Sequence, residues 1–363
     1  MKRRVSALFL ALLLLLSLPA CGGKEPPVEA EKPTVDMTPV VKDPPAVEPP
    51  VEEEVYEGPW NPLTGLPCET DLSNSRPYAI MLNNLQKALP QYGVAKADII
   101  YEVPAEGGIT RMLGIFTDIT DLGNVGSIRS ARDYYVQIAR GHDALYVHAG
   151  GSPGAYDLIA NAGIDSIDGI KGAYNAIFWR DATRKAVAGY EHSLFLTASE
   201  LKAYAEENRT MTHREGYVPS LTFAADGTPD GEAAASVKVT YYSGGKTTAF
   251  SYDAAAGGYL VSQYNGKYVD GQTGEQLLRE NVLVLFCNIN KIAGDSAGRL
   301  SVDIVGSGTG YFACGGKYTE IRWSKSTATS EIVYTLADGS PLTLGAGTSY
   351  VCVAPLGASA SFE

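Results

Sequence analysis

The chain has 363 residues, 45% of them hydrophobic, so it is long enough to form two domains with substantial cores. Its formal charge is −12, from 41 acidic and 29 basic residues, and no basic run follows the first four residues. Such a chain repels phosphate backbones, so we expect no nucleic-acid partner.

The first predicted element is a secretory signal over residues 1–20. A basic start, an apolar run of about 14 residues and a small residue precede Cys21. A spanning helix needs roughly 20 apolar residues, so cleavage is favoured over a membrane-spanning anchor. The residues before Cys21 also resemble a bacterial lipobox. We therefore expect an extracytoplasmic protein that is tethered to the cell membrane by lipid on Cys21.

Residues 21–58 are predicted to be the lipidated cysteine and a linker. Residues 22–58 hold eight prolines, ten acidic residues and three lysines, with almost no aromatic side chain. This composition cannot bury enough apolar surface to offset the entropy of ordering. We expect a disordered spacer between the membrane and the folded part.

Residues 59–212 are predicted to form an α/β domain with a mixed sheet. Strands are expected at Tyr78–Leu82, Ile99–Val103, Met112–Phe116 and in the segment DALYVH, residues 143–148. The glycines of PAEGGITR allow a hairpin or a wide loop between the second and third strands.

Three helices are predicted in the same region from their end signals. Ser130 opens a capping-box pattern ahead of a helix that Gly141 is placed to stop. Ser152 as N-cap and Pro153 at the first helical position begin the second helix, which ends near Gly163. Another capping box, at Thr197, begins the third.

Residues 213–363 are predicted to form a mostly antiparallel β domain. Short runs rich in valine, tyrosine and threonine alternate with turn residues. Asn265–Gly266 predicts a tight hairpin, Asp338–Gly339 predicts another, and one helical turn is expected near Glu275–Arg279.

The candidate site lies where strands end and helices begin. In α/β sheets the carboxyl ends of strands and the N-termini of the following helices face one side, where ligands collect. We therefore expect the turn 148–154 and the helix start at Ser130 to share one sheet edge, in a cleft with Arg129 or Arg132. The alternative is that these arginines pair with Glu102 or Glu106 and close the edge.

The chemistry of this site is limited by the motifs that the sequence lacks. There is no HExxH, no paired CxxC and no GxGxxG, so no metal or nucleotide cofactor is expected. Arginines and glycine-rich helix starts favour an anion. The candidate ligand-binding residues are Glu102, Glu106, Arg111, Arg129, Ser130, Arg132, His148, Gly150, Gly151, Ser152, Arg180, Asp181 and His192.

Three functions are consistent with these residues. The first is a lipoprotein that binds an anionic cell-wall glycan, a peptide or an envelope protein without catalysis. The second is a cell-wall hydrolase or transferase that uses a carboxylate or His148 as general acid and base. The third is a structural module whose polar residues only join two domains.

Several segments together resemble one protein family. They read NPLTGLP, RPYAIMLNN, KADIIYEVPAEGGITR, GSIRSAR, VHAGGSP, FWRD, VDGQTGE, GRLSVDIVGSGTGYF and IRWSK. This combination is similar to the YerB-type lipoproteins of Gram-positive bacteria over essentially everything after residue 60. The resemblance implies an N-terminal and a C-terminal domain, both of unknown function, and supplies no catalytic residues. Where that family has Pro-His-Asn, this chain retains only His192.

Overall fold

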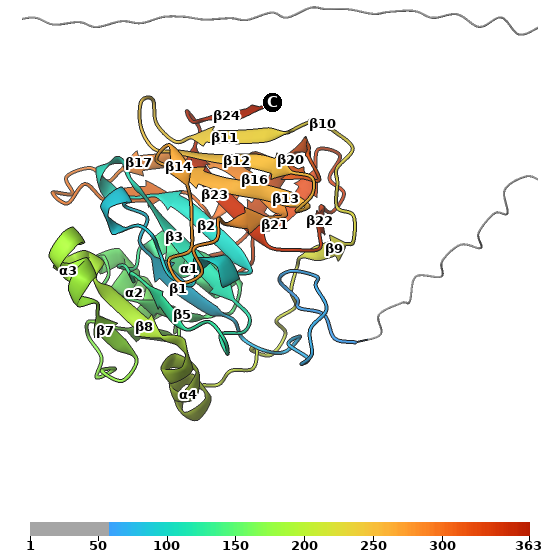
Figure 1. Cartoon of the computed structure of the whole chain (residues 1–363). Helices are drawn as coiled ribbons and strands as arrows, with labels where there is room; N and C mark the ends of the chain where they lie inside the picture. Colours follow the sequence, from blue (N-terminus) through green and yellow to red (C-terminus); the bar gives the residue numbers. More distant parts are fainter. Residues whose placement is uncertain (1–57) are drawn as a thin grey trace, which may run out of the picture. The chain divides into compact units, whose positions relative to one another are not determined.

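A single eleven-stranded sheet runs through the residues that the computed structural model describes, 58–363 (Figure 1). The expected signal sequence (1–20), the lipidation site Cys21 and nearly all of the expected linker (21–58) lie outside these residues. Residues 58–363 belong to one compact unit. The architecture is α/β with a mixed sheet, followed by a mostly antiparallel β region, as predicted.

The main sheet takes strands from both halves of the sequence. Its order is β10-β20-β19-β16-β23-β2-β3-β1-β5-β6, and β21 also pairs with β20. The strands are β1 (Tyr78–Leu82), β2 (Ile99–Pro104), β3 (Thr110–Phe116), β5 (Leu145–His148), β6 (Ser166–Asp168), β10 (Glu232–Ala233), β16 (Asn281–Cys287), β19 (Gly306–Cys314), β20 (Lys317–Lys325), β21 (Val333–Leu336) and β23 (Ser349–Pro355).

The two halves meet where β23 lies between β16 and β2. β23 runs parallel to β2, with Tyr101 opposite Val351, and parallel to β16, with Val284 opposite Cys352. On its other side, β2 forms a hairpin with β3, which is one of the two alternatives that the sequence left open. The expected boundary at residue 212 stays a prediction, while the strands on its two sides share one hydrogen-bonded ladder.

A second sheet has the order β14-β13-β12-β11-β24, with β15 also pairing to β13. It packs on one face of the main sheet: Ile80 and Tyr350 share a core cluster there with Phe250 of the second sheet. Its strands are β11 (Ser236–Thr240), β12 (Thr247–Asp253), β13 (Gly258–Gln263), β14 (Gly266–Lys267), β15 (Leu278–Arg279) and β24 (Ser359–Phe362).

Helices cover part of the opposite face. Met81 and Val351 pack there with Tyr134 and Ile138 of α1. The central strands β1, β2 and β3 are therefore buried on both faces, which explains their continuous apolar runs. The helices are α1 (Asp133–Gly141), α2 (Pro153–Asn161), α3 (Ala182–Ala188) and α4 (Ala198–Asn208), with 3-10 turns η1 (Gln86–Ala88), η2 (Val94–Lys96), η3 (Glu106–Gly108) and η4 (Tyr190–His192).

Three small sheets complete the described fold. One joins β4, β8 and β7, another pairs β17 with β18, and the third pairs β22 with β9. Their strands are β4 (Asn124–Gly126), β7 (Phe178–Arg180), β8 (Leu194–Thr197), β9 (Thr222–Ala224), β17 (Ile289–Lys291), β18 (Leu300–Val302) and β22 (Thr343–Gly345).

The helix-start predictions have mixed outcomes. The Ser152 hydroxyl caps α2 by accepting from the Ala155 N–H at 3.1 Å, as predicted. The capping box at Ser130 was wrong, because α1 begins at Asp133 and its N-cap, Arg132, makes no side-chain cap. The residues before α1 instead bond along 149–152, so tertiary contacts override the local signal.

Two local predictions in the C-terminal half also differ in outcome. The hairpin near Asn265 is confirmed, although Tyr264 and Asn265 are the turn residues with positive φ, at 52° and 61°. The helical turn near Glu275–Arg279 was wrong: Leu278 and Arg279 form β15, because their backbone pairs with β13.

Lys325, at the end of β20, has a buried amine, which should make the stability of the protein depend on pH. Its side chain donates to the Ser330 carbonyl, and burial lowers its pKa from 10.5 to about 8. Between pH 8 and pH 10.5 the unfolded state binds more protons at this amine than the folded state does, so the free energy of unfolding rises with pH. From pH 7.5 to 10.5 the wild type should gain on the order of 3 kcal/mol relative to Lys325→Met, measured by urea unfolding. Exposed Lys291→Met is the control, and an equal pH effect in both variants would contradict the prediction.

Candidate functional site

The structure brings the predicted segments together at one edge of the main sheet. The chain at 129–132 runs beside the turn after β5, with Ala149 N donating to Arg129 O at 3.0 Å and Ala131 N donating to Gly150 O at 2.8 Å. Arg111, the second residue of β3, lies at the same edge, since β3 runs antiparallel to β1. The arginines and the glycine-rich turn therefore lie next to each other.

Two of these arginines share one carboxylate. Arg132 binds Glu106 through two nitrogens, Nη2 at 2.9 Å and Nε opposite the second oxygen, and Arg111 Nη2 lies 3.2 Å from the same carboxylate. Burial, followed by the neighbouring Arg132, lowers the pKa of Arg111 to about 10. The pairing of Arg132 with Glu106 is the alternative that the sequence left open, and it occupies two of the three guanidinium nitrogens of Arg132.

Arg129 points to a different carboxylate. Its Nη1 donates to the Glu191 carbonyl at 2.8 Å and lies 3.4 Å from the exposed Glu191 carboxylate. Beside it, His192 Nδ1 is 2.8 Å from Asn83 Nδ2, and burial followed by Arg129 lowers the pKa of His192. His192 is thus held as a buried ring at the end of β1.

Arg180 and Asp181 serve local structure. The Arg180 guanidinium lies 3.5 Å from the Tyr190 ring centroid and donates to the Tyr190 carbonyl. The Asp181 carboxylate accepts from Arg184 N and caps α3.

His148 is buried and stacks on Tyr146. Its Nδ1 is 2.9 Å from the carbonyl oxygen of Gly150, and burial lowers its pKa. The nearby Asp168 accepts from Gly150 N at 2.8 Å and from Tyr156 Oη at 2.6 Å. The turn is therefore fixed by its own hydrogen bonds.

The two predicted glutamates lie in different environments. Glu102 is fully buried on the face of β2 that contacts the second sheet, and Lys246 Nζ lies 3.3 Å from it. The Glu102 carboxylate also accepts hydrogen bonds from Asn84, Thr110, Thr248, Gln263 and Tyr350. Glu102 thus joins both sequence halves through one buried network.

A cavity of about 540 Å³, here called the lysine-lined cavity, opens beside this network. It lies between the loop after β2 and the hairpin of β13 and β14. Among the residues that the structure describes, the charged ones that line this cavity are Lys238 and Lys246. The lining consists of Leu85, Gln86, Gly108, Ile109, Lys238, Gly245, Lys246, Thr247, Ala249, Ser262, Gln263, Tyr264 and Asn265.

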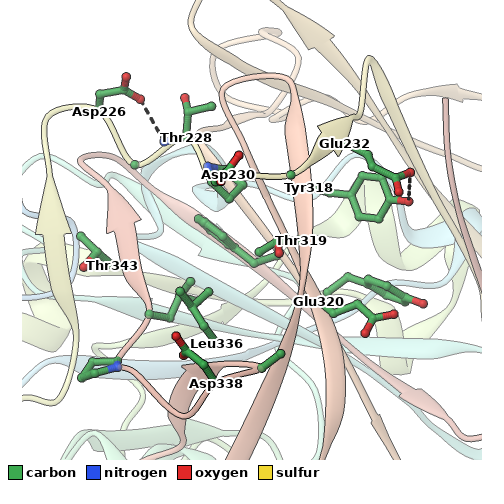
Figure 2. Close-up of a pocket in the computed structure, with 18 residues that line it drawn as sticks. Asp226, Thr228, Asp230, Glu232, Tyr318, Thr319, Glu320, Leu336, Asp338 and Thr343 are labelled. Carbon is green, nitrogen blue, oxygen red and sulfur yellow. Dashed lines mark hydrogen bonds between the residues drawn. The ribbon is translucent and has the colours of Figure 1, made fainter.

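A larger cavity of about 740 Å³ has the opposite charge (Figure 2). Within residues 58–363, its lining includes five carboxylates and no lysine or arginine. The five are Asp226, Asp230, Glu232, Glu320 and Asp338. This cavity is unsuited to an anionic ligand.

Residues 58–363 lack two further kinds of feature, a metal-binding cluster and a membrane-spanning helix. These residues contain no group of three or more His, Cys, Asp and Glu side chains that is placed to hold a metal ion. In the same range, no helix is both long and apolar enough to cross a membrane.

Comparison with known proteins identifies the family. Residues 63–212 match the domain described as "Protein of unknown function (DUF3048) N-terminal domain", and residues 237–351 match its C-terminal domain. A relative from Bacillus subtilis (strain 168), "Putative lipoprotein YerB", is 31% identical over 81% of this chain and 86% of its own length. The chain therefore belongs to the YerB-type DUF3048 family, as its motifs indicated.

A solved structure agrees with this assignment. The crystal structure of the YerB protein from Bacillus subtilis matches with a TM-score of 0.72 at 30% identity. The match covers 83% of this chain and 99% of that one.

Sequence reasoning did not find Lys238 and Lys246. Lys246 follows a glycine pair in a turn-like stretch, which is typical of an exposed residue. Only the packing of the second sheet on β2 places its amine against Glu102.

Proposed function

We propose that this chain is an extracytoplasmic lipoprotein, anchored through Cys21, which binds an anionic cell-envelope component in the lysine-lined cavity. One observation carries the proposal: in a chain of formal charge −12, both charged side chains that line this cavity are cationic. The lipoprotein name of the Bacillus subtilis relative supports the anchor.

The two lysines contribute differently. Lys246 is paired with Glu102, and its amine also donates to the Gln263 side chain at 2.6 Å. Its position is therefore fixed, and Glu102 neutralises most of its charge. Lys238 is exposed on β11, and within residues 58–363 it forms no ion pair. Lys238 is therefore the cation that is free to pair with a ligand.

The remaining lining suits a ligand with hydroxyl or amide groups. Gln86, Asn265, Ser262 and Thr247 supply donors and acceptors, and Tyr264 supplies an aromatic ring. A volume of about 540 Å³ lies in the usual range for small-ligand pockets. We infer an anionic glycan or peptide fragment of the envelope as the ligand class.

Calorimetry with a carboxylate-bearing wall-glycan fragment tests this proposal. Lys238→Gln should weaken binding by about 1 kcal/mol or more, since a charge-assisted contact is lost. Lys291→Gln removes the same charge from an exposed strand that does not line the cavity, and should leave binding unchanged. Equal weakening in both variants, or no binding by the wild type, would overturn the proposal.

A further inference from the structure

A third cavity lies at the opposite end of β1 from the lysine-lined cavity. It has a volume of about 230 Å³ and is here called the arginine-lined cavity. It sits where the chain enters β1, where α1 leads into β5, and where the segment after α4 leads into the C-terminal half. Its lining residues are Arg76, Arg140, Asp143, Ala144, Gly163, Asp165, Thr210, Thr212, His213 and Arg214.

Positive charge exceeds negative charge around this cavity. Three arginines and two aspartates line the cavity, so an excess of one positive charge remains; a fourth arginine, Arg209, pairs with Asp165 from outside the lining. The pairs are Arg76–Asp165 at 3.1 Å, Arg209–Asp165 at 3.0 Å, Arg140–Asp143 at 2.6 Å and Arg214–Asp143 at 2.6 Å. In a chain of net charge −12, such an excess is a local reversal of sign.

The cavity also offers hydrogen-bond donors. Arg140 and Arg214 line the cavity, and each binds Asp143 through Nη1. Thr210 and Thr212 line the cavity and carry hydroxyls, and His213 Nδ1 lies 3.2 Å from Asp143. Both aspartates are engaged by arginines, and Arg76 also donates to the carbonyls of residues 143, 144 and 210, so the donors left for a ligand come from Arg140, Arg214 and the threonine hydroxyls.

We propose that the arginine-lined cavity binds a tetrahedral oxyanion of the phosphate class. Arg76, Arg140 and Arg214 approach from three separate segments, and guanidinium groups match phosphate oxygens in paired contacts. The volume fits one phosphate group with its hydration and is too small for a glycan chain. This site is independent of the lysine-lined cavity.

A purely structural explanation makes a different prediction. If these arginines only hold the segment 208–214 in place, removing one changes stability but no anion binds. Arg76 does hold this segment, because it donates to the Thr210 carbonyl at 2.6 Å. The test therefore measures binding of the ion itself.

The experiment titrates the full chain with inorganic phosphate by calorimetry, at ionic strength held constant with sodium chloride. Saturable binding is expected, and Arg140→Gln should weaken it at least tenfold. Arg299→Gln is the matched control, because Arg299 pairs with Asp295 away from this cavity, and it should bind as the wild type does. If Arg140→Gln does not fold, Thr212→Val tests the same site without removing a charge and should weaken binding at least threefold.

Absence of saturable binding by the wild type, or an equal loss in Arg299→Gln, would overturn the proposal. Lys238→Gln should leave phosphate binding unchanged, so failure here and failure of the proposed function are distinguishable. A parallel titration with glycerol phosphate separates two sources of the ligand. Tighter binding of the ester assigns a phosphate carried on a larger molecule, and tighter binding of inorganic phosphate assigns the free ion.

Discussion

Glu102→Ala is expected to lower the free energy of unfolding by about 3 to 5 kcal/mol. The carboxylate is fully buried, and its removal leaves the amine of Lys246, whose side chain is only 2% exposed, without its counter-ion. The hydroxyls of Thr248 and Tyr350 also lose their acceptor. Urea unfolding followed by tryptophan fluorescence measures the change.

A double variant separates the ion pair from the rest of the network. Glu102→Ala combined with Lys246→Met should be more stable than Glu102→Ala alone, since the unpaired buried charge is gone. The exposed Glu275→Ala should change stability by less than about 0.5 kcal/mol. A Glu102→Ala protein as stable as this control would show that the network contributes little.

Residues 59–212 produced alone are expected to lack cooperative unfolding, whereas residues 58–363 unfold in one main transition. The isolated fragment exposes the edge of β2 that pairs with β23, and it uncovers Ile100 and Met112, which pack against the second sheet. An unpaired, apolar strand edge also favours aggregation.

Amide proton dispersion and urea unfolding of the fragment provide the measurement. Adding residues 213–363 as a second fragment should restore the dispersed spectrum, because β16 and β23 then complete the sheet. A sharp, reversible transition in the isolated fragment would show instead that the N-terminal half folds without its neighbour.

The strands of the N-terminal half could be predicted because each carries its own local signal. Tyr78–Leu82 is an apolar run between polar turns, and it forms β1 with the same bounds. Ser152 and Pro153 likewise encode the start of α2 in adjacent residues. Such features depend on a few neighbouring side chains, which the sequence shows directly.

The pairing of β2 with β23 carries no such signal. Tyr101 and Val351 are separated by 250 positions, and both runs are consistent with many partners. The candidate site could be predicted only in part for the same reason, because its contacts join residues that are far apart in the sequence. The sequence placed Arg132 near Glu106 as one of two alternatives, but the contact between Glu102 and Lys246 depends on how the second sheet packs.

Both ends of the main sheet are narrow. β6 has three residues and β10 has two, and the nine-residue β20 is covered by β10 along one part and by β21 along another. Long, bare strand edges act as templates on which another copy adds a strand. A wide sheet closed in this way resists edge-to-edge self-association, which would matter for copies that the proposed lipid anchor concentrates on one surface.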